Sequence, residues 1–384
     1  MEIFDAICRC VASSGHRRGA QMGVMRIDHP DIEEFIHAKQ NNSRLTGFNI
    51  SVAVTDEFMM ALRDKKPFPL RFAGTVHKEI DPVVLWETLM RSTWDWAEPG
   101  VLFIDRINEM NNLWYCEAIA ATNPCGEQPL PPFGACLLGS FNLPAYMSQA
   151  PNGTWGLDMR LFMKDIPIVV RAMDNVVDRA MYPLYEQEKE AKSKRRIGLG
   201  VTGLANALEA MGSDYGSTSF CDMTRQILCA LRNASYLAST ELAREKGVFP
   251  LYRKDDYLAG QFVKTLPLEI RQAISRHGMR NSHLTSIAPT GTISLCADNV
   301  SSGIEPVFAH SVRRLVNMDS GPREEVIPDY GVRVFNREGK TSSEVTVREH
   351  LDVLLSARPF VDSSISKTCN VPSDTPWASF KDID

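Results

Sequence analysis

The chain has 384 residues, of which 44% are hydrophobic and 23% are charged, so its composition is that of a globular protein and not of a disordered one. Its net charge of −5 and the lack of a long basic run argue against a dedicated nucleic-acid-binding protein. No apolar stretch approaches the about 18 residues that a membrane span needs, and the cysteines are irregularly spaced, so we expect a cytoplasmic protein with no membrane segment.

The first third of the chain alternates helical and β-rich patterns. Amphipathic spacing predicts helices at 3–12, 29–40, 57–63 and 81–96, and short apolar runs predict strands at 22–27, 49–54 and 101–104. Thr55 and Asp56 are suited to capping the third of these helices. This alternation favours an α/β fold.

The rest of the chain continues the same alternation. Predicted helices cover 159–181, 204–211 and 224–246, and predicted strands cover 197–202 and 284–288. We interpret the basic run Lys192–Arg196 as a solvated helix end or loop. No Pro-, Gly- or Ser-rich linker divides the chain, so a single continuous architecture is expected.

A segment between two prolines combines three chemically useful side chains. Asn123, Cys125 and Glu127 stand at every second position, so in an extended loop they would project from the same side. A thiol beside a carboxylic acid and an amide is a plausible catalytic set. The alternative is a surface loop that holds a buried cysteine, and the residues alone do not decide between the two.

Three other segments are candidates for redox chemistry or binding. Cys136 lies in apolar surroundings, which by themselves favour a buried structural cysteine. Residues 286–294 predict a strand that ends in a turn of glycine and hydroxyl residues; such a turn offers backbone N–H groups to a phosphate, and an ordinary capped helix explains the same pattern. Arg17 and Arg18 suit contacts with the phosphates or bases of a nucleotide, or a solvated loop.

Two further patterns carry less weight. Gly198, Gly200 and Gly203 have the spacing of a dinucleotide-binding fingerprint, but no strand is predicted before them, and close packing of a strand explains these glycines as well. The eight histidines show no metal-binding spacing, and no Cys-x-x-Cys pair is present, so we predict no metal site.

In this order, the motifs resemble the catalytic core of ribonucleotide reductases, closest to the adenosylcobalamin-dependent (class II) branch. The resemblance runs from Phe4 to about Asp382, and its most specific segments are 123–127 and 133–143. It implies a partial ten-stranded α/β barrel with an internal finger loop that carries the radical cysteine. The implied organisation is one incomplete domain over 1–384, with a specificity loop at 13–21 and a finger loop at 121–130.

The resemblance also implies roles for individual residues. Cys125 would be the thiyl radical that abstracts the ribose 3′ hydrogen, Glu127 the general base on the 3′ hydroxyl, and Asn123 a hydrogen-bonding partner of the ribose. Cys136 would be one half of the redox dithiol, and we find no position in the chain for the other half. The remaining implied contacts are Pro124 and Gly126 for the substrate, Pro289, Thr290, Gly291, Thr292 and Ile293 for its phosphates, and Arg17, Arg18 and Gln21 for the effector.

The implied function is the reduction of ribonucleotides, expected to be ribonucleoside diphosphates, to 2′-deoxyribonucleotides for DNA synthesis. Implied partners are adenosylcobalamin, the ribonucleotide substrate, a deoxynucleotide or ATP effector, a thioredoxin-type reductant, and a complementary reductase segment or a second copy in a homodimer. Compared with the family, the N- and C-terminal parts of the barrel are not found in this sequence, so we expect a fragment or a gene-split subunit. The alternatives are the large subunit of a class I reductase, or a truncated nucleotide-binding segment that is inactive without complementing chains.

Overall fold

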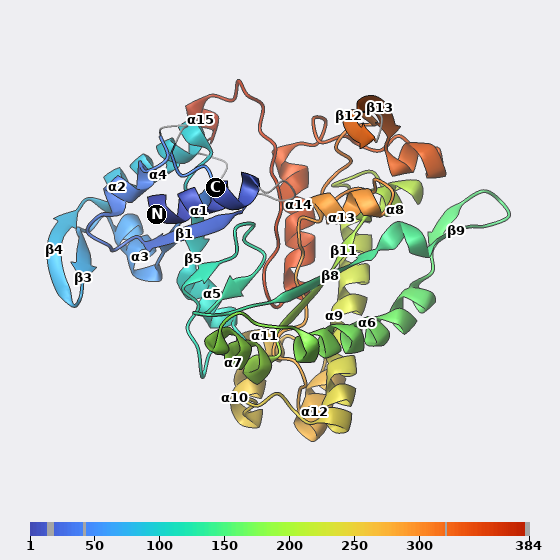
Figure 1. Cartoon of the computed structure of the whole chain (residues 1–384), viewed down its shortest axis with the longest axis horizontal. Helices are drawn as coiled ribbons and strands as arrows, with labels where there is room; N and C mark the ends of the chain where they lie inside the picture. The colour runs from blue at the N-terminus through green and yellow to red at the C-terminus, as the bar shows by residue number, and fades with distance from the viewer. Residues whose placement is uncertain (14–18, 41–43, 319–320, 381–384) are drawn as a thin grey trace. The chain divides into compact units, whose positions relative to one another are not determined.

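A computed structural model describes residues 1–13, 19–40, 44–318 and 321–380 of the chain (Figure 1). The chain divides into two compact units, Met1–Pro132 with Pro372–Asp384, and Phe133–Val371, and each unit is described by itself. The expected single domain over 1–384 stays a prediction. Within the described ranges, no helix combines the length and the apolar character that crossing a membrane requires.

The first unit is built around a three-stranded parallel sheet in the order β1-β2-β5. Its strands are β1 (Gln21–Arg26), β2 (Phe48–Val54) and β5 (Gly100–Phe103). Val52 in the central strand lies opposite Met25 on one side and Val101 on the other. β2 is buried along nearly its whole length, because both faces of a parallel sheet are covered.

Helices and one hairpin complete the first unit, and most of them pack into a hydrophobic core with this sheet. They are α1 (Glu2–Ser13), α2 (Ile32–Ile36), α3 (Asp56–Asp64), α4 (Pro82–Trp96), α5 (Ile104–Met110), α15 (Trp377–Phe380), and the antiparallel pair of β3 (Phe68–Phe72) with β4 (Thr75–Ile80). Thr55 caps α3 by accepting the backbone N–H of Phe58, as the sequence predicts. The side chains of Phe58, Phe68 and Leu89 are buried at the centre of this core.

The second unit contains a parallel pair of strands, β8 (Leu137–Asn142) and β11 (Ile197–Thr202). Leu199 of β11 also bridges Thr285, and Ile287 bridges Ile365, so two further extended segments run parallel to β11. A Cβ atom at Gly200 would lie 2.2 Å from the carbonyl oxygen of Ser286, so only glycine fits between these segments. The interpretation of Gly200 as a close-packing residue is therefore confirmed.

Helices and two antiparallel hairpins complete the second unit. The helices are α6 (Met159–Arg179), α7 (Tyr185–Lys194), α8 (Leu204–Ala210), α9 (Thr218–Lys246), α10 (Lys254–Ala259), α11 (Gln261–Lys264), α12 (Leu268–His277), α13 (Gly291–Cys296) and α14 (Val347–Ala357), with the short turns η1 (Leu143–Tyr146), η2 (Gly331–Phe335) and η3 (Arg358–Phe360). The hairpins pair β9 (Met147–Gln149) with β10 (Trp155–Leu157), and β12 (Ser311–Met318) with β13 (Gly321–Pro328). The core includes the contact between α6 and α9, the two longest helices of this unit.

The α/β class is confirmed, and the strands expected at 22–27, 49–54, 101–104 and 197–202 are found within one residue of those limits. The helix expected at 29–40 is shorter, because after Ile36 the backbone continues in turns such as Gln40 N–H to His37 O. The strand expected at 284–288 makes only isolated bridges. Strand pairing within the described residues does not close a barrel.

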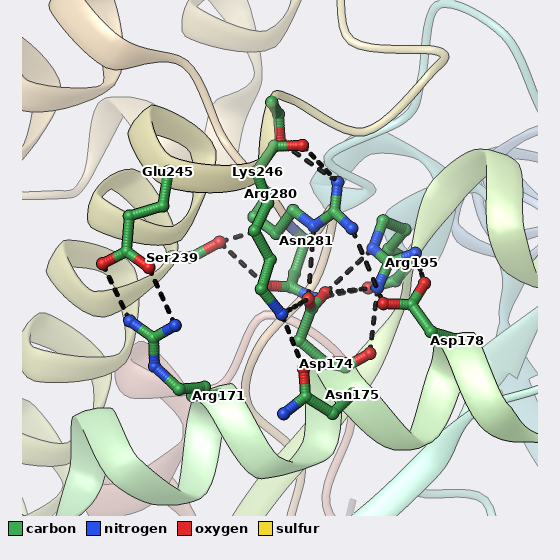
Figure 2. A network of polar contacts seen from close by, with 11 residues as sticks. Arg171, Asp174, Asn175, Asp178, Arg195, Ser239, Glu245, Lys246, Arg280 and Asn281 are labelled. Carbon is green, nitrogen blue, oxygen red and sulfur yellow. Dashed lines mark hydrogen bonds and ion pairs between the residues drawn. The ribbon is translucent and has the colours of Figure 1, made fainter.

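The expectation that Lys192–Arg196 is solvated is wrong. The run ends α7 as expected, but Lys194, Arg195 and Arg196 are buried. Figure 2 shows the reason: Arg195 enters a network of ion pairs between α6, α9 and the segment before residue 282. Its Nε donates to Asp174 Oδ1 at 2.8 Å and its Nη1 donates to Asp178 Oδ1 at 2.6 Å. Buried charges are tolerated only when they are paired in this way.

Candidate functional site

The segment with Asn123, Cys125 and Glu127 is a tight hairpin loop in the first unit. Its stems are β6 (Ala121–Thr122) and β7 (Pro129–Leu130), which pair antiparallel. Asn123 closes the loop twice, because its backbone N–H donates to Gln128 O and its side-chain Oδ1 accepts the Gln128 N–H, both at 3.0 Å. The loop conformation is therefore fixed by hydrogen bonds within the loop.

The expected extended arrangement of this loop is wrong. Gly126 has a φ of +81° and donates its N–H to Asn123 O, so the chain turns back at this position. As a result Cys125 is exposed at the tip, whereas Glu127 is only 3% exposed. The thiol and the carboxyl group thus belong to one short loop but occupy different environments.

The loop is also tied to the sheet by a residue that the sequence reasoning did not single out. The side-chain Nδ2 of Asn49 donates to Pro124 O at 2.7 Å. Asn49 is the one exposed residue in β2, which is otherwise buried. A polar residue inside an apolar strand pattern was the available signal, and only the fold shows which loop it contacts.

Cys136 lies in the second unit, directly before β8. Its thiol is half-buried and donates to the carbonyl oxygen of Leu137 at 3.5 Å. The half-buried position differs from the fully buried structural cysteine that the apolar surroundings favoured. The redox role of Cys136 stays a prediction.

Residues Pro289–Ile293 form the turn that leads into α13 in the same unit. Thr290 has a φ of +53°, and its hydroxyl accepts the N–H of Gly303 at 2.7 Å and contacts the hydroxyl of Thr202 at 2.8 Å. Thr202 is the last residue of β11, so the strand end and the turn are fixed to each other. The turn is therefore held rigidly from inside, while Gly291, Thr292 and Ile293 are exposed.

A cavity of about 330 Å³ opens beside this turn. Gly291 and Ser294 of α13 line it, together with Ser302, Glu305 and Arg314. A Cβ atom at Gly291 would meet no atom within 4 Å, so the space in front of this residue is open. A ligand group can reach the backbone of the first turn of α13 here without displacing a side chain.

The carboxylate of Glu305 on the cavity wall belongs to a polar cluster that the sequence reasoning missed. Lys367 Nζ lies 2.5 Å from Glu305 Oε2 and 2.7 Å from Nδ1 of His350. Burial and the neighbouring Lys367 lower the pKa of His350 to about 4, so its imidazole is neutral at pH 7. Burial also lowers the pKa of Lys367, against the effect of Glu305.

The effector residues are only partly described. Arg17 and Arg18 lie outside the described residues. Gln21 is the first residue of β1; its backbone N–H donates to Gly47 O at 2.8 Å, and its side-chain amide donates to Phe4 O at 3.5 Å. Among the described residues, no group of three or more His, Cys, Asp and Glu side chains is arranged to hold a metal ion.

Comparison with known proteins gives a family match over residues 1–383, to the model described as "Ribonucleotide reductase, barrel domain". The chain is 33% identical to the vitamin B12-dependent ribonucleoside-diphosphate reductase of Thermoplasma acidophilum, over 97% of this chain and 50% of that protein. It is 32% identical to the enzyme of the same name from Mycobacterium tuberculosis, over 97% of this chain and 55% of that protein. The ribonucleoside-diphosphate reductase subunit alpha of Chlamydia pneumoniae is 25% identical over 78% of this chain and 34% of its own length. The chain thus spans about half the length of the first two relatives.

Proposed function

Because this chain belongs to the ribonucleotide reductase barrel-domain family, we propose that it carries the catalytic loop of a vitamin B12-dependent ribonucleotide reductase. The complete enzyme would reduce ribonucleotides, expected to be ribonucleoside diphosphates, to 2′-deoxyribonucleotides. The observation that carries the proposal is the rigid Asn-Pro-Cys-Gly-Glu hairpin, which presents an exposed thiol two residues from a buried carboxyl group. Relatives named vitamin B12-dependent match at 32–33% identity and the subunit alpha matches at 25%, which favours this reading over a class I subunit.

In the proposed mechanism, each side chain of the loop has one task. The sulfur of Cys125, as a thiyl radical, takes the hydrogen atom from C3′ of the ribose and becomes a thiol. Glu127 accepts the proton of the 3′ hydroxyl, which eases departure of the 2′ hydroxyl as water. Asn123 holds the sugar through its amide Nδ2, because the bond from the Gln128 N–H to Oδ1 orients the amide with Nδ2 away from the loop backbone. Cys136 and a second thiol then supply two electrons and two protons and become a disulfide, and the Cys125 thiol returns its hydrogen atom to C3′, which restores the thiyl radical.

The cofactor proposed with this function is adenosylcobalamin. Because this cofactor brings its own cobalt, it would not need a cluster of metal-ligating side chains from the chain. The exposed thiol of Cys125 would be accessible to a cofactor of this size. When bound, it supplies an organic radical through homolysis of its cobalt–carbon bond. The part of the chain is to hold the Cys125 thiol on a loop that hydrogen bonds keep in one conformation.

The substrate phosphates are assigned to Pro289, Thr290, Gly291, Thr292 and Ile293. Support comes from the open space in front of Gly291 and from the internal hydrogen bonds that fix Thr290. The specificity loop at 13–21, with Arg17, Arg18 and Gln21, is proposed to respond to a deoxynucleotide or ATP effector. The ten-stranded barrel with an internal finger loop at 121–130 is part of the same proposal.

Partner proteins are proposed on the same basis. A thioredoxin-type reductant would regenerate the thiol of Cys136. A homodimer or a complementary reductase segment would cover exposed apolar surface, and α1 offers such a surface, because Ile3, Phe4, Ile7 and Val11 are each at least 50% exposed.

The test is a turnover assay with cytidine diphosphate, adenosylcobalamin, an effector and dithiothreitol, with and without a complementary reductase segment. We expect deoxycytidine diphosphate to form, and Cys125→Ala to abolish its formation. Cys229→Ala, on α9 of the other unit, is the matched control and should keep activity. Turnover that survives Cys125→Ala contradicts the proposal. Nucleotide binding without turnover, even with complementing chains, favours the inactive nucleotide-binding segment instead.

A further inference from the structure

The strand β12, which pairs with β13 (Figure 1), contributes to the wall of the cavity beside α13. Val312 and Arg314 of β12 line it. Residues two apart in a strand share a face, so the intervening Arg313 belongs to the opposite face. Its side chain is 80% exposed and lies 3.7 Å from Glu324. Of these two adjacent arginines, Arg314 therefore lines the cavity and Arg313 faces solvent.

Arg314 has no carboxylate partner among the residues that the structure describes. Glu325 stands directly opposite it in the β12–β13 register, but the carboxylate of Glu325 contacts Arg323, at 3.7 Å. Within the described ranges, the other arginines around this region have acidic partners: Arg333 lies 2.6 Å from Asp298, and Arg337 lies 2.7 Å from Asp214. Arg314 on the cavity wall therefore differs from Arg333 and Arg337, whose guanidinium groups are paired with carboxylates.

The two carboxylates on the cavity wall are occupied elsewhere. Both oxygens of Glu305 have partners, Lys367 Nζ at 2.5 Å and the Thr368 N–H at 2.6 Å. Asp329 Oδ2 accepts from Asn206 Nδ2 at 2.8 Å and from the Gly331 N–H at 2.7 Å. Neither carboxylate forms an ion pair with Arg314, so its positive charge is available to an anion in the cavity.

We propose that Arg314 binds the terminal phosphate of the nucleotide whose phosphates are held at Pro289–Ile293. Gly291 and Arg314 line the same cavity of about 330 Å³, so one phosphate chain can reach both. A guanidinium group matches a phosphate with two parallel hydrogen bonds, which a lysine cannot do. The hairpin β12–β13 would thus make binding depend on the number of phosphates. This inference rests on the proposed phosphate site and adds the residue that selects the diphosphate.

The test compares the binding of cytidine, cytidine monophosphate and cytidine diphosphate to the chain by titration calorimetry. Arg314→Gln should raise the Kd for the diphosphate about 10- to 100-fold, the range for a lost charged hydrogen bond, and change the Kd for cytidine less than twofold. Arg314→Lys should recover part of this loss. Arg313→Gln is the matched control, one residue away on the opposite face, and should leave all three values within about twofold. Unfolding midpoints of the variants check that the fold is kept.

The outcomes separate this inference from the function on which it rests. If Gly291→Ala weakens binding of the diphosphate and Arg314→Gln does not, the phosphate site stands and the role of Arg314 is wrong. If the unaltered chain binds cytidine and its diphosphate equally, or binds neither, the phosphate site and the role of Arg314 both fail.

Discussion

Gly291 is the residue at which the proposed phosphate site is most open, because a Cβ atom there would meet nothing within 4 Å. Gly291→Ala should therefore keep the fold, and gains up to about 1 kcal/mol from the better helix propensity of alanine. The added methyl group stands where a phosphate would approach, so we expect the Kd for cytidine diphosphate to rise at least about tenfold. Calorimetry measures the affinity and thermal unfolding measures the stability.

Gly156 in β10 supplies the control for this substitution. It also has open space at its Cβ position, and it lies outside the cavity residues. Gly156→Ala should leave the affinity unchanged. Equal affinities of the Gly291→Ala variant and the unaltered chain would show that Pro289–Ile293 does not bind the phosphates.

Some expectations about single residues could be derived from the sequence, and others could not. Thr55 as a helix cap could be read from the sequence, because the cap depends on its immediate neighbours. Gly200 could be recognised as a close-packing residue from the strand that carries it, but the segment that it packs against, at Ser286, could not. The bend at Gly126 could not, because the alternation of Asn123, Cys125 and Glu127 suggests an extended chain. The bend is fixed by hydrogen bonds between Asn123 and Gln128, which the pattern does not reveal.

At the scale of elements, the ion-pair network in Figure 2 joins α6 to the start of β11 and to α9. Its centre is Asp174, whose side chain is fully buried and accepts from Arg195, Arg280 and Asn281. Asp174→Asn would leave the buried guanidinium group of Arg195 and the half-buried one of Arg280 short of negative charge. We expect the free energy of unfolding to fall by about 3–5 kcal/mol, measured by urea denaturation.

The control for Asp174 lies in the same network. Glu245 pairs with Arg171 at 2.8 Å, and both side chains are 44% exposed. Glu245→Gln should leave the free energy of unfolding nearly unchanged, because solvent screens an exposed pair. Equal effects of the two substitutions would show that burial does not set the importance of these pairs.

The elements that the sequence predicted depend on residues close together in the chain, whereas those that were missed depend on contacts between residues far apart in the chain. The strand at 197–202 is an apolar run that the sequence displays directly. The burial of Arg195 is not displayed, because Asp174 lies 21 positions from Arg195 and 106 positions from Arg280. A basic run in the sequence looks solvated until the fold brings the acidic side chains to it. The strand expected at 284–288 failed for a similar reason: its neighbours come from residues 199 and 365 and touch it only at isolated points.

At the scale of the whole molecule, the candidate residues are divided between the two compact units. Asn123, Cys125 and Glu127 belong to the first, and Cys136 and Pro289–Ile293 belong to the second. The sequence order of the motifs predicted the family, which the match over residues 1–383 bears out. It did not predict the division into units, because no linker-like composition marks the boundary at Pro132.

Glu209 and Asp362 should each lower the stability of the second unit as the pH rises from about 4 to 7, while the lowered pKa values of His283 and His350 act in the opposite direction. Burial raises the pKa of Glu209 from 4.5 to about 7 and that of Asp362 from 3.8 to about 6. At these two carboxyl groups, the folded state therefore holds protons that the unfolded state has lost in this range. Their contribution to stability is fully present below the pKa of the unfolded state and is lost as the pH rises through the pKa of the folded state. Glu209 alone contributes about 3 kcal/mol.

Urea denaturation between pH 4 and pH 8 measures this dependence. Relative to the unaltered chain, Glu209→Gln should remove a loss of stability mainly between pH 5 and 7, and Asp362→Asn mainly between pH 4 and 6. Variants that keep the pH dependence of the unaltered chain would contradict the assignment.

The closure of the hairpin loop by Asn123 has a consequence for the direction of proton flow. An asparagine amide has a donating and an accepting end, and here the accepting end is turned toward the Gln128 N–H, so the donating end is turned away from it. The loop therefore offers a sugar hydroxyl a donor, and a hydroxyl that accepts from Asn123 keeps its own hydrogen to give. In the proposed reaction the recipient is Glu127, so a backbone contact within the loop would orient the substrate hydroxyl before any chemistry begins. Aspartate could not replace asparagine in this role, because both oxygens of its carboxylate accept hydrogen bonds and neither donates one.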